Sequence, residues 1–159
     1  MDEPIILASA SPRRQELLSM IGLPYEVYAP DVDESETGSP DGIVLRLAQK
    51  KARAAAAVYP GRVILAADTL VYAKGEVLGK PRDEADALRM IGLLRDAWHE
   101  VYTGVCVIDR SGLEHTGADK TAVHFIPISD EEIRVYVNGG EPFGKAGAYA
   151  IQGIAGVFI

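Results

Sequence analysis

The chain has 159 residues, 48% of them hydrophobic and 25% charged, which is enough for one domain with a sizeable core. Its 16 lysines and arginines against 23 aspartates and glutamates give a net charge of −7. That charge argues against broad binding to nucleic acid, which needs a basic surface. The single cysteine, Cys106, excludes an intrachain disulfide and a thiolate metal cluster. The sequence has neither a signal-peptide pattern nor an apolar run long enough for a bilayer, so we expect a cytoplasmic protein without a membrane partner.

The first part of the sequence predicts a strand, a helix and a second strand. Residues 5–8 form a continuous apolar run typical of a buried strand, and residues 25–28 form a shorter one. Between them Ser11 is a good N-cap and Pro12 a good first helical residue. The helix is expected to end before Gly22, with three apolar side chains facing inward: Leu17, Leu18 and Ile21.

The remaining elements follow the same alternation. Proline and polar starts predict helices over 40–58, 83–94 and 129–138, and apolar runs predict strands over 63–67, 101–109 and 120–126. Residues 70–78 read as a hairpin that turns near Lys74 and Gly75. The last helix has the pattern of a capping box, Ser129 with Glu132. We predict a mixed, twisted α/β sheet with flanking helices, in which ligands tend to lie beyond the carboxyl ends of strands.

The junction between the first strand and the first helix is a candidate phosphate site. Ser9 and Ser11 precede two arginines, Arg13 and Arg14, in the first turn of the helix. A helix N-terminus already carries partial positive charge, so arginines are unfavourable there unless an anion binds. Guanidinium groups and free backbone N–H groups both favour phosphate. The alternative is a surface turn whose arginines reach into water.

Other charged residues extend this candidate site. Asp68 directly follows the predicted strand 63–67, where a carboxylate can hold Mg²⁺ or accept a proton from water, although a lone aspartate more often caps a turn. Lys51 shares a helical face with Val44 and Ala48, so it either reaches past them to water or points into a site. Lys80 follows the hairpin, and Glu34 lies in an acidic loop. Several cations, several carboxylates and no apparent nucleophile suit metal-assisted attack of water on a phosphate ester.

With these residues the chain closely resembles the Maf family of nucleoside triphosphate pyrophosphatases, also called septum formation inhibitors. The matching segments occur in family order across nearly the whole sequence: LASASPRR (7–14), RLAQKKA (46–52), ADT (67–69), GEVLGKP (75–81), HEVYTG (99–104) and KAGAYAIQG (145–153). The resemblance implies an α/β fold shared with the inosine triphosphate pyrophosphatases, with two lobes around a cleft. It also implies hydrolysis of a nucleoside triphosphate to the monophosphate and pyrophosphate with a divalent metal, Mg²⁺ or Mn²⁺.

The resemblance also implies roles for individual residues. Asp68 would accept the proton of the attacking water and, with Glu34, hold the metal. Lys51 and Lys80 would complete the catalytic set. The substrate-binding residues would be Ser9, Ser11, Arg13, Arg14, Thr69 and Gln152. Of these, Arg13, Thr69 and Gln152 match the branch of the family that acts on dTTP, UTP and modified pyrimidine analogues.

Two further readings stay open at this point. In the first, the protein carries out the same chemistry on 7-methyl-GTP or another non-standard nucleotide. In the second, it is a non-catalytic regulator of septum formation that binds a division protein. The family also makes a homodimer possible. We expect a single Maf-like domain over residues 1–159, lacking the family's closing C-terminal strand and helix.

Overall fold

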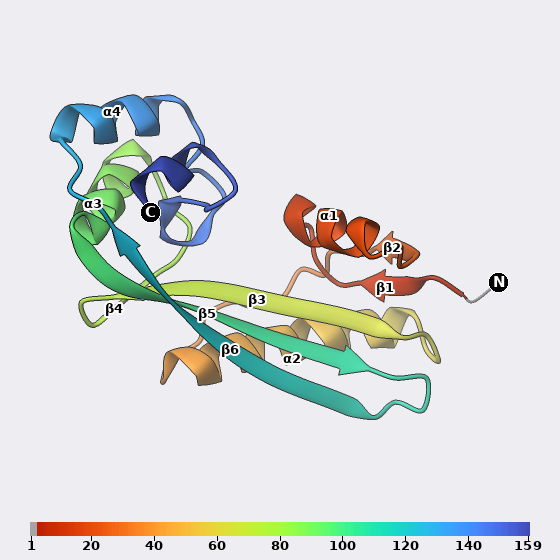
Figure 1. Ribbon diagram of the computed structural model, residues 1–159. Coiled ribbons are helices and arrows are strands. Elements are labelled where there is room, and N and C mark those ends of the chain that lie inside the picture. The colour runs from red at the N-terminus through yellow and green to blue at the C-terminus, as the bar shows by residue number, and fades with distance from the viewer. Residues whose placement is uncertain (1–2) are drawn as a thin grey trace. The chain divides into compact units, whose positions relative to one another are not determined.

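The computed structural model describes residues 3–159 and divides the chain into two compact units (Figure 1). Unit 1 consists of the described part of Met1–Asp68 together with Thr103–Asp119. Unit 2 consists of Thr69–Tyr102 and Lys120–Ile159. Strand β3 passes from unit 1 into unit 2 directly after Asp68, so this residue lies where the chain leaves unit 1.

The strands form a mixed sheet with the order β2-β1-β3-β5-β6, and β4 pairs separately with β3. β1 runs parallel to both β2 and β3, whereas β4 is antiparallel to β3. This confirms the predicted mixed α/β sheet with flanking helices. The strands are β1 (Ile5–Leu7), β2 (Tyr25–Val27), β3 (Ile64–Ala73), β4 (Glu76–Leu78), β5 (Ala97–Ile108) and β6 (Glu114–Phe125).

Unit 1 is organised around the long helix α2 (Pro40–Val58), which begins and ends where the sequence predicts. Its alanine-rich face is fully buried at Ala48, Ala52 and Ala55 and shares a core cluster with Ile6 and Ile64. Small side chains let a helix approach its neighbours closely. Helix α1 (Pro12–Met20) follows β1 in the same unit (Figure 1).

A glycine on β5 sets the position of α2. A Cβ built on Gly104 would lie 2.5 Å from the backbone C and O atoms of Val44, so only a residue without a side chain fits there. Val44 is itself fully buried. Because Lys51 lies two helical turns after Val44, the same close contact fixes the position of that lysine in unit 1.

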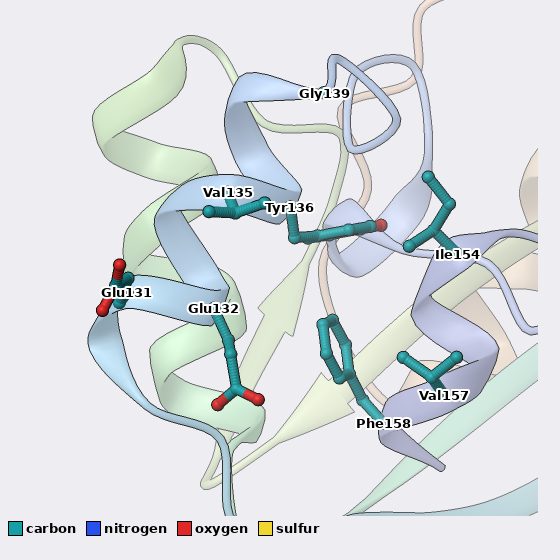
Figure 2. A pocket seen from close by; sticks show the side chains of 8 residues that line it. All are labelled: Glu131, Glu132, Val135, Tyr136, Gly139, Ile154, Val157 and Phe158. Carbon is teal, nitrogen blue, oxygen red and sulfur yellow. The ribbon is translucent and has the colours of Figure 1, made fainter.

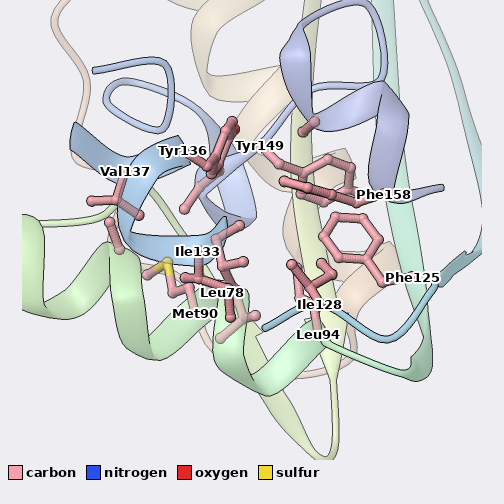
Figure 3. Close-up of a cluster of buried hydrophobic side chains, with 14 of the residues drawn as sticks. Leu78, Met90, Leu94, Phe125, Ile128, Ile133, Tyr136, Val137, Tyr149 and Phe158 are labelled. Atoms are coloured by element: carbon pink, nitrogen blue, oxygen red, sulfur yellow. The ribbon is translucent and has the colours of Figure 1, made fainter. Parts of the chain in front are cut away.

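Unit 2 contains α3 (Glu84–Leu94) packed against α4 (Asp130–Asn138), as Figure 1 shows. Two 3₁₀ helices follow, η1 (Ala146–Ala148) and η2 (Ile154–Phe158). Figure 3 shows the core of this unit, which joins both α-helices to Phe125, Tyr149 and Phe158. The predicted capping box is confirmed, because the Glu132 N–H donates to Ser129 Oγ at 3.2 Å and the Ser129 N–H donates to Glu132 Oε2 at 2.7 Å.

The structure corrects three sequence-based expectations. Leu17 and Ile21 are 61% and 72% exposed, and only Leu18 of α1 is buried. Leu17 and Ile21, four residues apart, share one side of the helix, and that side is the exposed one. The strand predicted to stop at Asp68 continues to Ala73. The strands predicted over 101–109 and 120–126 begin earlier, at Ala97 and Glu114. The first part of β6 is exposed residue after residue, so it carries no apolar pattern that could have marked it as a strand.

Within residues 3–159, no helix has both the length and the apolar character needed to cross a membrane.

A buried histidine makes unit 2 sensitive to acid. His99 is 3% exposed, its Nε2 lies 2.6 Å from Tyr149 Oη, and its ring packs edge-on against Phe125. Burial, together with the nearby His124, lowers the pKa of His99 from 6.5 to about 4. The folded protein therefore keeps this imidazole neutral at pH values where the unfolded chain protonates it.

We therefore expect the free energy of unfolding to fall as the pH drops from 6.5 toward 4. A pKa difference of about 2.5 units corresponds to a loss of about 3 kcal/mol over this window. Urea unfolding at pH 7.5, 6, 5 and 4 measures the loss. His99→Gln keeps a polar partner for Tyr149 and should flatten this part of the pH profile. Equal slopes in the two proteins would show that His99 does not cause the acid sensitivity.

Candidate functional site

The first turn of α1 is joined to β1 through the buried Ser9. Its side-chain oxygen accepts hydrogen bonds from the Ser11 N–H at 3.2 Å and from Arg14 Nη1 at 2.8 Å. Ser11 occupies the predicted N-cap position, but its own hydroxyl makes no capping bond in the described structure. Ser9 thus holds both the helix N-terminus and one arginine in place, while Arg13 lies beside them, half-buried.

Two carboxylates and a lysine meet in unit 1. Lys51 Nζ lies 2.5 Å from Asp68 Oδ1 and 2.7 Å from Glu34 Oε1. The side chains of Lys51 and Asp68 are only 13% and 15% exposed, whereas Glu34 is 49% exposed. Burial alone lowers the pKa of Lys51, but the hydrogen bonds to Asp68 and Glu34 outweigh it and raise that pKa above its ordinary value.

Arg14 adds a second positive charge to this group. Burial lowers the pKa of Arg14, and the negative charges of Asp68 and Glu34 act in the opposite direction. The cluster of Ser9, Arg14, Glu34, Lys51 and Asp68, which we call the unit 1 polar cluster, therefore holds two cations and two carboxylates. Its four charges balance in the partly buried site, which limits the cost of removing them from water.

The sheet explains why these residues meet. The parallel pairing of β1 with β3 runs to Leu7 opposite Leu65, and the Ala8 N–H donates to the Leu65 oxygen at 2.8 Å. Ser9 and Asp68 follow just past this pairing, at the carboxyl side of both segments. Asp68 lies inside a continuous strand rather than at its end. It still lies just beyond the carboxyl end of the parallel pairing between β1 and β3, and α/β proteins bind ligands at such ends.

Sequence reasoning missed the contacts that hold the acidic loop. Lys50 Nζ lies 2.6 Å from Glu36 Oε1 and donates to the Asp33 carbonyl at 3.3 Å. Arg46 Nε bonds to the other oxygen of Glu36 at 2.6 Å. These contacts tie the residues on either side of Glu34 to α2. The spacing of Arg46 and Lys50, four residues apart on one helix, was the available signal.

Three of the predicted site residues lie in unit 2: Thr69, Lys80 and Gln152. Thr69 begins the part of β3 that belongs to this unit, and Lys80 is exposed between β4 and α3. The Gly147 N–H donates to the Gly79 oxygen at 3.0 Å, and a Cβ on Gly147 would lie 2.6 Å from Val71 Cγ2. The segment that leads to Gln152 is thereby packed against both the Lys80 loop and β3.

The donor set of unit 1 fits a hard divalent cation. Asp68 and Glu34 approach the same ammonium group, so their oxygens converge on one position suited to a positive charge. Among residues 3–159 there is no group of three or more His, Cys, Asp or Glu side chains that could hold a metal. Mg²⁺ is commonly bound by one or two carboxylates and completes its shell with water and substrate phosphates. Two converging carboxylates match that pattern.

A separate apolar groove lies on unit 2 (Figure 2). It has a volume of about 420 Å³ and is lined by α4 and η2, including Val135, Tyr136, Ile154 and Val157. None of the predicted site residues lines it, so it is distinct from the positions discussed above.

Comparison with known proteins identifies the family of this chain. The family model described as Maf-like protein matches residues 4–159. The chain belongs to the Maf family. The dTTP/UTP pyrophosphatase of Symbiobacterium thermophilum is 50% identical over 159 residues, which cover 99% of this chain and 81% of that protein. The dTTP/UTP pyrophosphatase of Geotalea uraniireducens is 51% identical, over 98% of this chain and 81% of its own length.

Among solved structures, a HAM1 protein from Coxiella burnetii shares the fold. The TM-score is 0.55 at 19% identity, with 78% of this chain and 73% of that chain covered. The Maf family and the mixed α/β fold anticipated from the sequence motifs are both confirmed.

Proposed function

We propose that this Maf-family protein hydrolyses dTTP and UTP to the nucleoside monophosphate and pyrophosphate. Two relatives named dTTP/UTP pyrophosphatase are about half identical to it over nearly its whole length. The observation that carries the proposal is the pair of carboxylates, Asp68 and Glu34, held around one cation position beside Arg14. A triphosphate with its counter-cation is the kind of ligand such a mixed-charge site accepts.

In this reaction Asp68 acts as the general base. A carboxylate oxygen of Asp68 takes a proton from the attacking water. The resulting hydroxide attacks the α-phosphorus, and pyrophosphate leaves. Asp68 is anchored on a sheet strand and is mostly buried, which fixes the position of the accepting oxygen. Glu34 and Asp68 would hold Mg²⁺ or Mn²⁺, and the bound ion would neutralise phosphate charge.

The cations of unit 1 bind phosphate oxygens in this proposal. Arg14, fixed by Ser9, offers N–H donors in a planar fork, and Arg13 adds a second guanidinium on the same helix turn. The Lys51 ammonium, which neutralises Asp68 and Glu34 in the structure, would bind a phosphate oxygen of the triphosphate. A divalent metal held by the two carboxylates would then supply the positive charge that Lys51 provides in the structure.

We assign phosphate and base recognition in unit 2 to three residues. The exposed Lys80 supplies another positive charge for phosphate, whereas Thr69 and Gln152 provide polar groups for the base. A glutamine amide both donates and accepts hydrogen bonds, which suits a pyrimidine edge with a carbonyl next to an N–H.

Product analysis tests the reaction directly. With dTTP and Mg²⁺, the protein should release dTMP and pyrophosphate, with lower kcat/KM for CTP and 7-methyl-GTP. Asp68→Asn removes the base but keeps the shape of the side chain, so turnover should fall by a factor of 100 or more, on the order of a lost general base. Chromatography separates these products from dTDP and inorganic phosphate.

The matched control is Asp109→Asn, which changes an exposed turn carboxylate of unit 1 outside the polar cluster. Asp109→Asn should keep wild-type turnover. Release of dTDP and phosphate, or full activity in Asp68→Asn, would contradict the proposed reaction. A preference for 7-methyl-GTP would keep the chemistry but overturn the assigned base.

The exchange of cations at Asp68 and Glu34 makes a second prediction. Lys51→Met removes the ammonium that occupies the cation position, so the nucleotide-free protein should bind Mn²⁺ more tightly than wild type, by about tenfold. Electron paramagnetic resonance of free Mn²⁺ measures this affinity without any turnover.

Arg53→Met is the control, because Arg53 lies on the same helix and pairs with Glu114 rather than with the two proposed ligands or their loop. Its Mn²⁺ affinity should stay within about twofold of wild type. Unchanged or weaker Mn²⁺ binding in Lys51→Met would show that lysine and metal do not compete for one position.

A further inference from the structure

This inference rests on the proposed contact between Gln152 and the base. Gln152 lies in a tight turn of unit 2, where the Gly153 N–H donates to the Ala150 oxygen at 3.0 Å. The turn is anchored at both ends by small buried residues, Ala150 and Ala155, which are 3% and 0% exposed. Residues 151–154 between them are all exposed. Apolar burial of their side chains therefore does little to fix the turn, and polar contacts have to hold it.

One carboxylate provides those contacts. Glu141 Oε2 accepts a hydrogen bond from the Ile154 N–H at 2.7 Å, and Glu141 Oε1 accepts one from the Ala155 N–H at 3.3 Å. These two N–H groups open η2, directly after the Gln152 turn, and have no partner within their own helix. Hydrogen bonds to an ionised acceptor are among the stronger ones in proteins. Glu141 therefore fixes the backbone immediately beyond Gln152.

Gly153 shows how closely the carboxylate lies on this turn. A Cβ added to Gly153 would lie 2.2 Å from Glu141 Oε1 and 2.5 Å from its Cδ. The φ of Gly153 is −103°, which other residues adopt freely, so the backbone conformation does not require glycine. Glycine is needed at this position because it leaves space for the Glu141 carboxylate. The glutamate and the glycine fit together as a pair.

Helix α4 supports the same arrangement. Figure 2 shows the Tyr136 side chain extending from α4 toward Ile154. Its hydroxyl donates to the Ala148 oxygen at 3.0 Å and lies 3.4 Å from Glu141 Oε1. The Lys145 ammonium also bonds to the Glu141 backbone oxygen. These contacts hold the segment that carries Glu141 to α4 and to Lys145. The Glu141 carboxylate in turn holds the exposed turn through its bonds to Ile154 and Ala155.

We propose that Glu141 is a positioning residue for recognition of the pyrimidine base. Its carboxylate holds the turn after Ala150 in the one conformation that presents the Gln152 amide to the base, and it does not touch the substrate itself. Glu141 therefore acts on base selectivity and leaves the phosphate chemistry unchanged. If Glu141 served only to stabilise unit 2, its replacement would not affect recognition of the base differently from recognition of the phosphates.

The experiment compares Glu141→Gln, Gln152→Ala and the double variant. Glutamine keeps the size of the side chain but replaces one accepting oxygen with an N–H₂ group, which cannot accept from a backbone N–H. We measure KM and kcat for dTTP and the inhibition constant for tripolyphosphate, which has no base. Glu131→Gln, an exposed residue of α4, is the matched control.

We expect Glu141→Gln to raise KM for dTTP about fivefold, the order of one lost hydrogen bond, with kcat and tripolyphosphate inhibition within twofold of wild type. Adding Glu141→Gln to Gln152→Ala should cause no further loss, because both act through one contact. Additive losses, or weaker inhibition by tripolyphosphate, would overturn the proposal.

Amide hydrogen exchange at Ile154 and Ala155 separates this inference from the function on which it rests. Faster exchange in Glu141→Gln than in Glu131→Gln is expected whatever the substrate is. Unchanged exchange would overturn the positioning role directly. If exchange accelerates but Gln152→Ala leaves dTTP turnover intact, then the assigned base contact is wrong and the specificity role of Glu141 fails with it.

Discussion

The contact between the Lys51 ammonium and the carboxylates of Asp68 and Glu34 is the interaction on which the rest of the site depends. A buried aspartate without a cation would be costly in free energy, and the lysine meets that requirement at 2.5 Å. Neighbouring features serve the same contact. Gly104 lets α2 approach the sheet, Ser9 fixes Arg14 nearby, and the ion pairs of Glu36 hold the loop of Glu34 against α2.

The proposed chemistry divides between the two units. In this proposal unit 1 carries Asp68 on a strand, Lys51 and the arginines on helices, and Glu34 on a loop that ion pairs hold to α2. Unit 2 carries Gln152 on an exposed turn that depends on polar contacts. With the proposed roles, base selectivity would change through a few turn residues while the residues proposed for catalysis stay in place, as is common for sites built on loops over a rigid framework.

Sequence patterns predicted the elements well because local signals were strong. Ser39 and Pro40 start α2 correctly, and the capping box at Ser129 marks the start of α4. The burial of Leu17 and the end of β3 were predicted wrongly, since both depend on which elements pack nearby, and periodicity alone does not encode that. The motifs that revealed the Maf family also singled out Asp68 and Lys51. The contact between Asp68 and Lys51, 17 residues apart, could be seen only in the three-dimensional structure. The same holds for the close packing of Glu141 on Gly153, 12 residues apart.

A crystal structure with Mn²⁺ and a non-hydrolysable dTTP analogue tests the central claim most directly. Anomalous scattering locates the metal independently of any interpretation of side chains. We predict a manganese peak within coordination distance of oxygens from both Asp68 and Glu34, with the Lys51 ammonium moved onto a phosphate. A metal held elsewhere, with Lys51 still bridging the two carboxylates, would contradict it.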